Sequence, residues 1–185
     1  ESGSISTTQQ VITECKSTEG TAYRTEMLDK IYYSDIDEVG KLQLYMRYKM
    51  LDGWSKPAPL NGMPDGDNNY PFMLSDGMTI YFANNSLEGL GGYDIYITRF
   101  NTSTDRYLLP ENVGMPFNST GNDYMMAIDE INGLGWFATD RNLPDSLVCI
   151  YTYVLNEKKE YYDFESDNKM DIINAAHIYS IAATQ

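Results

Sequence analysis

The acidic loop at residues 63–71, MPDGDNNYP, has the spacing of a metal-binding turn. Asp65, Asp67 and Asn69 alternate along it, and side-chain oxygens at alternating positions open calcium-binding loops of the D-x-D-x-N type. A complete EF-hand loop would also need Gly where this sequence has Tyr70, and usually Glu where it has Asp76. We therefore weigh a weak calcium site against a solvated turn between two sheet units, and we expect no other cofactor.

A glycine-rich stretch, GLGG at residues 89–92, raises the question of phosphate binding. A dinucleotide fingerprint needs G-x-G-x-x-G after a strand and at the start of a helix, and a P-loop needs Gly-Lys-Ser/Thr. Here the glycines precede an alternating run, YDIYITRF (93–100), that is typical of a strand. The glycines therefore predict a tight corner that leads into a strand. Tyr93, at the end of the corner, is a candidate ligand contact, because binding residues often lie on loops.

Side chains suited to covalent catalysis are scarce in this sequence. The chain has 1 histidine, His177, so Ser-His-Asp or Cys-His chemistry would have to use a residue that lies outside the repeated segments described below. The 27 acidic residues could supply the paired carboxylates of a glycoside hydrolase, but no spacing selects one pair. A carbohydrate-active hydrolase is therefore the alternative to a non-enzymatic function.

Polar and aromatic residues near expected strand ends are the candidates for ligand binding. A second polar loop, NSTGND at residues 118–123, precedes an expected strand as the acidic loop at 63–71 does. This correspondence would make Asp123 equivalent to Asp67. Asp140 and Arg141 follow another strand, either as a surface ion pair or as ligand contacts. Trp54 lies in an expected outer strand, where it could face a partner. The ligand-binding candidates are Trp54, Asp67, Asn69, Tyr93, Asp123, Asp140 and Arg141.

Composition sets the broad class of protein. The chain has 185 residues, 42% of them hydrophobic, which is enough for a folded core. Its net charge of −14 repels nucleic acid and anionic membrane surfaces, so we expect no nucleic-acid partner and no direct membrane insertion. The 16 tyrosines favour half-buried strand positions and an all-β chain. Cys15 and Cys149 could form one disulfide, although Cys149 in an expected strand favours a buried thiol.

Two segments of similar sequence, residues 69–100 and 123–154, indicate an internal repeat. Each reads as a short apolar segment, a polar turn, an aromatic strand, a Gly or Pro loop and a second alternating strand. Units of this size, built from short antiparallel strands, are typical of β-propeller blades. The aligned pairs include Tyr70 with Tyr124, Tyr81 with Trp136, Phe82 with Phe137, Ala83 with Ala138, and Ile95 with Ile150.

A weaker third copy at residues 30–50 completes a set of about three antiparallel blades. We expect the blades at about residues 21–62, 69–113 and 123–164, after an N-terminal extension or partial blade strand at 1–20. Residues 165–185 are expected to form a C-terminal helix, because apolar side chains recur there at helical spacing. These side chains are Ile172, Ala175, Ala176, Tyr179 and Ala183.

The string YPFMLSDGMTIYFANN (70–85), followed by GGYDIYI (91–97), is similar to the TolB-type or PD40 repeat, a WD40-like β-propeller unit. That repeat combines a Pro, an apolar residue, Ser-x-Asp-Gly, an aromatic strand and Asp-Ile-Tyr. This sequence departs from the pattern at Leu74-Ser75-Asp76, where the Pro before Asp-Gly is absent. Residues 67–155 resemble PD40-like proteins of Bacteroidetes throughout, whereas residues 1–50 do so loosely.

The resemblance implies an incomplete β-propeller from a longer chain, because propellers typically have about four to eight blades. The remaining blades would come from the same parent chain or from a second copy. It also implies a place in the periplasm or on the outer-membrane surface of a Gram-negative bacterium, with a protein or glycan of the cell envelope as partner. We therefore expect a non-enzymatic binding or assembly module. The alternatives are a carbohydrate-active hydrolase and a purely structural segment of a larger envelope protein.

Overall fold

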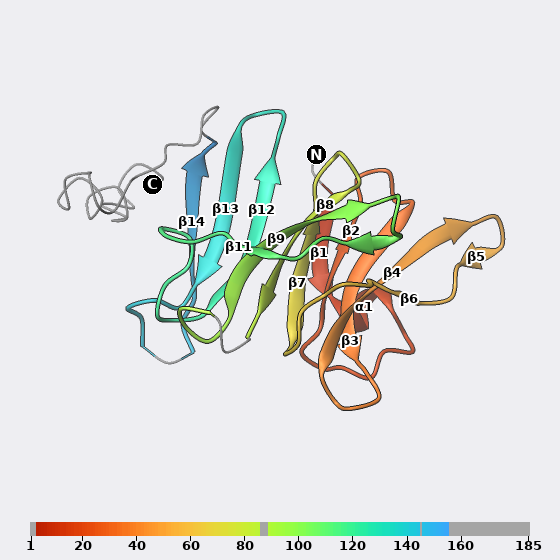
Figure 1. Ribbon diagram of the computed structural model, residues 1–185, viewed down its shortest axis with the longest axis horizontal. Coiled ribbons are helices and arrows are strands. Elements are labelled where there is room, and N and C mark those ends of the chain that lie inside the picture. The colour runs from red at the N-terminus through yellow and green to blue at the C-terminus, as the bar shows by residue number, and fades with distance from the viewer. Residues whose placement is uncertain (1–2, 86–88, 145, 156–185) are drawn as a thin grey trace.

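The computed structural model describes residues 3–85, 89–144 and 146–155 (Figure 1). These residues form three antiparallel sheets and one short helix, which confirms the all-β class. None of their helices is long and apolar enough to cross a membrane. The C-terminal helix expected at residues 165–185 and the end of the third expected blade lie outside the described residues.

The first sheet has the strand order β1-β2-β3-β4-β5, and β6 also pairs with β4. Its longest strands alternate, so that Tyr32 faces the second sheet while Ile31 and Tyr33 face the other way. Pro59 lies in the short edge strand β6, where a missing N–H is tolerated. The elements are β1 (Ser4–Thr7), α1 (Thr8–Val11), β2 (Thr21–Arg24), β3 (Lys30–Ile36), β4 (Leu42–Met50), β5 (Gly53–Trp54) and β6 (Ala58–Pro59).

The second sheet has the order β10-β9-β8-β7, with β11 also paired to β9. The polar turn expected between its first two strands is present: Gly77 has φ +65°, and Asp76 accepts hydrogen bonds from the N–H groups of Met78 and Thr79. The strands are β7 (Asn68–Met73), β8 (Thr79–Asn84), β9 (Asp94–Asn101), β10 (Arg106–Tyr107) and β11 (Glu111–Asn112).

The third sheet has the order β12-β13-β14, formed by β12 (Asp123–Asp129), β13 (Leu134–Thr139) and β14 (Cys149–Val154). Its cross-strand pairs match those of the second sheet: Ala138 lies opposite Ile150 as Ala83 lies opposite Ile95. The second and third sheets also each have a bulge in their first strand, β7 and β12, near the loop that precedes the strand. The residues aligned in the sequence thus occupy the same register positions in two successive sheets.

The sheets pack face to face in chain order (Figure 1). Strand β7 contacts β2, β3 and β4 of the first sheet, and β12 contacts β7, β8 and β9 of the second. One hydrophobic core runs through all three sheets, and a second cluster lies on the opposite face of the first sheet. The second cluster consists of Ile12, Ala22, Ile31 and Tyr33, with Val11, Cys15, Tyr45 and Trp54 packed against it.

Both cysteines are free thiols, and each is partly buried. Cys15 packs against the second cluster beside α1, whereas Cys149 begins β14 in the third sheet. Cys149 is therefore a free thiol, as expected, but it is only partly buried. Among the described residues, its strand β14 lies at the edge of the third sheet.

Candidate functional site at the loop end of the sheets

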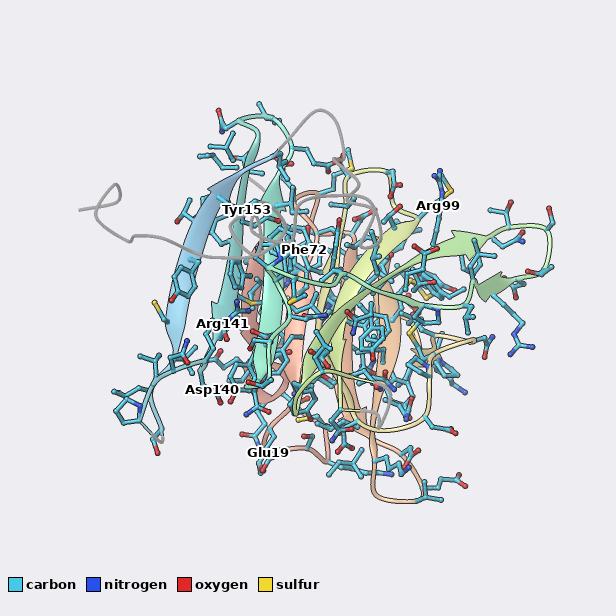
Figure 2. The ribbon with its side chains drawn as sticks, turned by 60° about the vertical axis from the view of Figure 1, so that its left-hand side comes forward. Glu19, Phe72, Arg99, Asp140, Arg141 and Tyr153 are labelled. Atoms are coloured by element: carbon cyan, nitrogen blue, oxygen red, sulfur yellow. The ribbon has the colours of Figure 1, made fainter. Side chains whose placement is uncertain are left out.

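Six of the seven ligand-binding candidates lie at one end of the second and third sheets, where β7 and β12 begin and β8 and β13 end. We call this the loop end. Asp140 and Glu19 lie at the loop end, and Arg99 lies at the opposite end (Figure 2). The seventh candidate, Trp54, is far from it: it lies in β5, beyond the opposite end of β4, and packs against the second hydrophobic cluster.

Asp67 joins the first sheet to the second at the loop end. Its Oδ1 accepts a hydrogen bond from the backbone N–H of Leu42, where β4 begins, at 2.9 Å. Its Oδ2 accepts one from Nδ2 of Asn85, also at 2.9 Å. The backbone N–H of Asp67 in turn donates to Oδ1 of Asn85 at 2.7 Å. The carboxylate is therefore occupied by donors from both sheets.

Asn122 makes the same contacts between the second and third sheets, with the two side-chain types exchanged. Its Oδ1 accepts from the backbone N–H of Tyr93, just before β9, at 3.0 Å. Its Nδ2 donates to Oδ2 of Asp140 at 2.7 Å, and its backbone N–H donates to Oδ1 of Asp140 at 2.7 Å. Asp67 with Asn85 and Asn122 with Asp140 are thus two versions of one junction between successive sheets. The expected equivalence of Asp123 with Asp67 is therefore wrong by one residue: Asp123 lies opposite Thr139 as Asn68 lies opposite Asn84.

Asp123 and Arg141, both ligand-binding candidates, form a buried ion pair. Arg141 Nη2 lies 2.6 Å from Asp123 Oδ1, and the Asp123 side chain is 0% exposed. The other carboxylate oxygen accepts hydrogen bonds from the backbone N–H and the hydroxyl of Ser119, at 2.7 and 2.9 Å. Arg141 therefore pairs with the start of β12, and the surface pair with its neighbour Asp140 is not formed.

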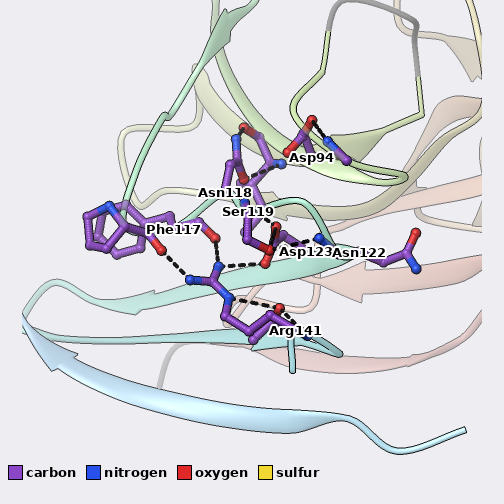
Figure 3. A network of polar contacts seen from close by, with 12 residues as sticks. Asp94, Phe117, Asn118, Ser119, Asn122, Asp123 and Arg141 are labelled. Carbon is purple, nitrogen blue, oxygen red and sulfur yellow. Dashed lines mark hydrogen bonds and ion pairs between the residues drawn. The ribbon is translucent and has the colours of Figure 1, made fainter. Parts of the chain in front are cut away.

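The Arg141 guanidinium also fixes the loop that leads into β12 (Figure 3). It donates to the carbonyl oxygens of Pro116, at 2.6 Å, and of Phe117. Its Nε donates to Thr139 Oγ1 at 3.1 Å, and its Cζ lies 5.2 Å from the centroid of the Phe137 ring. The Arg141 side chain therefore has a structural role, because its nitrogen donors bind β12, β13 and the loop between the second and third sheets.

The described part of the glycine loop, residues 89–92, closes on the loop before the third sheet and leaves no cradle for a phosphate. The backbone N–H groups of Leu90 and Gly91 donate to Oδ2 of Asp94, which is fully buried at the start of β9. A Cβ on Gly91 would lie 2.0 Å from the carbonyl oxygen of Gly121. The glycines therefore permit close approach between two loops, as the sequence predicts, and their N–H groups are aimed at a protein carboxylate.

Burial raises the pKa of Asp94, and the nearby negative charge of Asp123 raises it further; the two backbone hydrogen bonds act in the opposite direction. The Oδ1 atom of Asp94 is buried without a hydrogen-bond partner. Asp94 thus differs from Asp123, whose oxygens both have hydrogen-bond partners. Asp94 is not among the sequence candidates, because Asp-Ile-Tyr at positions 94–96 is typical of an ordinary strand start.

Asn69 ties the second sheet to the first. Its side chain is buried, and its Oδ1 accepts from the backbone N–H and the hydroxyl of Thr21, at 3.0 and 2.9 Å, and from the Ser34 hydroxyl. Its Nδ2 donates to the Glu19 carbonyl oxygen at 3.0 Å. Asn69 is therefore a structural residue, since its side-chain oxygen and nitrogen have partners in the first sheet and in the loop before β2.

The calcium candidates do not converge on one point. Asp65 is exposed, Asp67 is bonded to Leu42 and Asn85, and Asn69 is directed at the first sheet. Within the described ranges, no group of three or more His, Cys, Asp or Glu side chains is placed to hold a metal ion. Calcium binding stays a prediction that these contacts do not strengthen.

Three tyrosines from two sheets meet at the loop end. The rings of Tyr70 and Tyr124 have centroids 5.6 Å apart, and Tyr93 lies 6.0 Å from Tyr70 and 6.2 Å from Tyr124. All three are partly exposed. Tyr70 has φ +54°, in the left-handed region that a bulky residue rarely adopts. Such backbone strain costs about 1–3 kcal/mol and is concentrated at functional sites.

Carboxylates surround this tyrosine cluster. The Tyr124 hydroxyl donates to Oδ2 of Asp140 at 2.7 Å. Burial acts to raise the pKa of Asp140, but hydrogen bonds from Asn122 and Tyr124 outweigh it and lower the pKa below its ordinary value. Burial and the Asp140 charge raise the pKa of Tyr124 to about 12. Burial also raises the pKa of Tyr93, and the charges of Asp67 and Glu19 add to the effect.

Comparison of the chain with protein-family models, with curated proteins and with solved structures finds no match. The site is therefore interpreted from its own geometry. Of the sequence candidates, Tyr93 and Asp140 lie at the tyrosine cluster and Asp67 beside it. Asn69 joins the second sheet to the first, while Asp123 and Arg141 fix the third sheet and the loop before it.

Two members of the cluster, Tyr70 and Tyr124, were aligned in the sequence but not chosen as site residues. The signal that could have found them is their shared place: each lies at the start of the first strand of its unit, next to a polar loop. Residues at equivalent places in stacked sheets come close together when the sheets pack face to face.

Proposed function

We propose that this chain is a non-enzymatic binding or assembly module, in which the loop end meets a protein or a glycan. The three sheets would be successive blades of an incomplete β-propeller, and the tyrosine cluster would be the contact face. The assignment to the envelope of a Gram-negative bacterium rests on the TolB-type resemblance of residues 67–155.

The blade interpretation is supported by the order and the faces of the sheets. Each sheet uses consecutive strands, and each packs on the next through the first strand of the following unit. The junctions at Asp67 and Asn122 repeat the same hydrogen bonds between successive sheets. Serial sheets with one repeated junction fit a radial arrangement better than an interleaved sandwich.

The observation that carries the binding proposal is the meeting of Tyr70, Tyr93 and Tyr124 beside Asp67 and Asp140. Tyrosine rings are rigid and amphipathic, and they are enriched in protein interfaces. Both Asp67 oxygens and Oδ1 of Asp140 each accept one hydrogen bond within the chain, and both residues are partly exposed. A second lone pair on each oxygen is therefore left for a sugar hydroxyl or for a Lys or Arg of a partner. The net charge of −14 favours basic or neutral partners over acidic ones.

The hydrolase alternative needs an acid with a raised pKa facing a second carboxylate across a substrate. Asp94 has the raised pKa, and Asp123 is close enough to influence it. Both side chains are 0% exposed, and Asp123 is paired with Arg141. Because a sugar could reach neither carboxylate without rearrangement of the loops, we favour binding over hydrolysis.

A binding screen tests the proposal. Purified chain is applied to an array of bacterial glycans and to a library of short peptides rich in Lys and Arg. We expect binding to one class of probe, and Tyr93→Ala and Tyr124→Ala to weaken it by about tenfold or more, as expected of aromatic hot spots. Tyr48→Ala is the matched control, because Tyr48 is an exposed tyrosine in the distant half of β4.

Two outcomes would contradict the proposal. One is the absence of binding to every probe, and the other is binding that Tyr93→Ala and Tyr124→Ala leave unchanged. Release of new reducing ends from a bound glycan, abolished by Asp94→Asn, would support the hydrolase in its place.

A further inference from the structure

The tyrosine cluster of Tyr70, Tyr93 and Tyr124 lies among negative charges that come from two other parts of the fold. Burial raises the pKa of Tyr70, and the charge of Glu19, from the loop before β2, raises it further. The Tyr124 hydroxyl donates a hydrogen bond to the carboxylate of Asp140, just after β13, at 2.7 Å. Carboxylates of the first and the third sheet therefore both act on the cluster.

Glu19 is the carboxylate of this set that the fold leaves free. Its backbone is fixed, because its carbonyl oxygen accepts a hydrogen bond from Nδ2 of Asn69 at 3.0 Å and its N–H donates to Oγ of Ser17 at 3.1 Å. Its side chain is exposed and has no hydrogen-bond or ion-pair partner among the described residues. The Glu19 charge is thus held close to the tyrosines and is available to a partner.

The described basic residues at the loop end already have acidic neighbours. Arg141 is paired with Asp123 at 2.6 Å, and it donates to the carbonyl oxygen of Pro116 as well. The exposed lysines of the first sheet at this end are similarly accompanied: Asp35 lies beside Lys16, and Asp37 and Glu38 lie in the same turn as Lys41.

The opposite end of the sheets carries both signs of charge. Asp76 lies there, in the turn between β7 and β8, and the exposed Arg99 lies near the end of β9 (Figure 2). Lys49, near the end of β4, is also exposed at that end. The two ends therefore differ in charge, and the tyrosine cluster lies at the more acidic one. Complementary charge across an interface steers a partner and suppresses wrong ones.

The shape of the tyrosine cluster favours a cation over a sugar. Its rings do not form one flat face for a pyranose, because Tyr70 meets Tyr93 at 89° and Tyr124 at 66°. A side-chain donor that a sugar could use, Nδ2 of Asn122, is bonded to Asp140. Lysine and arginine carry only donors, and they are attracted to aromatic faces within about 6 Å of the ring centroid.

We propose that the loop end binds a basic protein segment, which places a lysine or arginine side chain against the tyrosine cluster and pairs it with Glu19. This inference rests on the proposed function and selects a protein over a glycan as the partner. The contact combines an ion pair at an exposed carboxylate with cation–π attraction to the rings.

Fluorescence anisotropy with three labelled probes tests the proposal. The probes are a peptide of alternating Gly and Arg, a peptide of alternating Gly and Gln, and a neutral oligosaccharide of N-acetylglucosamine. We expect the 185-residue chain to bind the Arg peptide at least about tenfold more tightly than either of the other probes. Glu19→Gln should weaken this binding by about three- to fivefold, as expected for the loss of one exposed ion pair. Tyr93→Ala should weaken it by about tenfold or more.

Asp52→Asn is the matched control for Glu19→Gln. Asp52 is an exposed carboxylate in the turn between β4 and β5, at the opposite end of the sheets, and its replacement should leave binding unchanged. Circular dichroism confirms that each variant is folded, which Glu19→Gln should allow because the backbone hydrogen bonds of Glu19 are retained.

Three results would overturn the inference. If Glu19→Gln and Asp52→Asn weaken binding equally, the peptide is attracted by the net charge of −14 without a site. If the oligosaccharide binds, Tyr93→Ala weakens it and the Arg peptide does not bind, the partner is a glycan and the proposed function stands. If none of the three probes binds, the inference fails, and the wider screen of glycans and peptides decides the proposed function separately.

Discussion

Asp67 and Asn122 occupy the same place in successive sheets and accept the same hydrogen bond, from the N–H of Leu42 and of Tyr93 respectively. Their side-chain partners are exchanged, because Asp67 is bonded to Asn85 and Asn122 to Asp140. An acid and an amide can trade places in this pair, since a carboxylate and an amide oxygen both accept and the amide nitrogen donates. The polar residues at the loop end are therefore primarily parts of a repeated junction between sheets.

Arg141→Met should destabilise the fold strongly. The substitution leaves the Asp123 carboxylate buried without its cation, which costs about 3–5 kcal/mol in free energy of unfolding. Urea denaturation measures the change. The double variant Asp123→Asn with Arg141→Met should recover part of the loss, because it removes both charges. Arg106→Met, at an exposed arginine, should change stability by less than about 0.5 kcal/mol. If Arg141→Met lowered the free energy of unfolding by less than about 1 kcal/mol, the Asp123–Arg141 ion pair would not be important for stability.

Gly91→Ala should lower stability by about 1–3 kcal/mol, because the new methyl group would clash with the carbonyl oxygen of Gly121 and move one loop away from the other. Thermal unfolding followed by circular dichroism measures the effect. Leu90→Ala in the same loop should cost less, since Leu90 is largely exposed. Equal melting temperatures for wild type and Gly91→Ala would mean that the two loops do not meet.

Alkaline pH should destabilise the protein through its tyrosines. Burial raises the pKa values of Tyr23, Tyr107 and Tyr124 to about 12, from an ordinary value of 10.0. The folded state thus holds these protons more tightly than the unfolded chain. Their contribution to stability is fully present below pH 10 and is lost as pH rises towards 12.

Urea midpoints measured between about pH 8 and about pH 12 check this dependence, and tyrosinate absorbance follows the ionisation. Tyr124→Phe should show a smaller alkaline loss, because it removes one of the tyrosine hydroxyls whose pKa is raised in the folded state. A midpoint that stays constant across this range would contradict the burial of these side chains.

The sequence was sufficient to predict the sheets and their repeat. Alternating apolar positions and the turn at Asp76 and Gly77 are local signals, and they place Ala83 and Ala138 at the same register. The tight corner formed by the glycines before β9 was also predictable. The helix and the Gly-Lys-Ser/Thr sequence that phosphate-binding loops require are both missing after GLGG, and an alternating strand pattern follows it.

The role of the polar residues was harder to read. Arg141 stands next to Asp140 in the sequence, yet the pairing of β12 with β13 brings it to Asp123. Asn69 belongs to a metal-like spacing, but the packing of the second sheet on the first turns it towards Thr21. Both outcomes depend on how strands and sheets meet over long separations, which the spacing of residues along one loop does not encode.

The most direct test of the repeated junction is an exchange of its two residues in the second sheet. Asp67→Asn alone places an amide nitrogen beside the Asn85 amide nitrogen, and Asn85→Asp alone places two carboxylates side by side. Each single variant should therefore lower the free energy of unfolding, measured by urea denaturation, by about 1 kcal/mol or more. The double variant recreates the Asn122 and Asp140 arrangement. Its free energy of unfolding should return to within about 0.5 kcal/mol of wild type. A double variant as unstable as the sum of the two single variants would contradict the equivalence of the sheets.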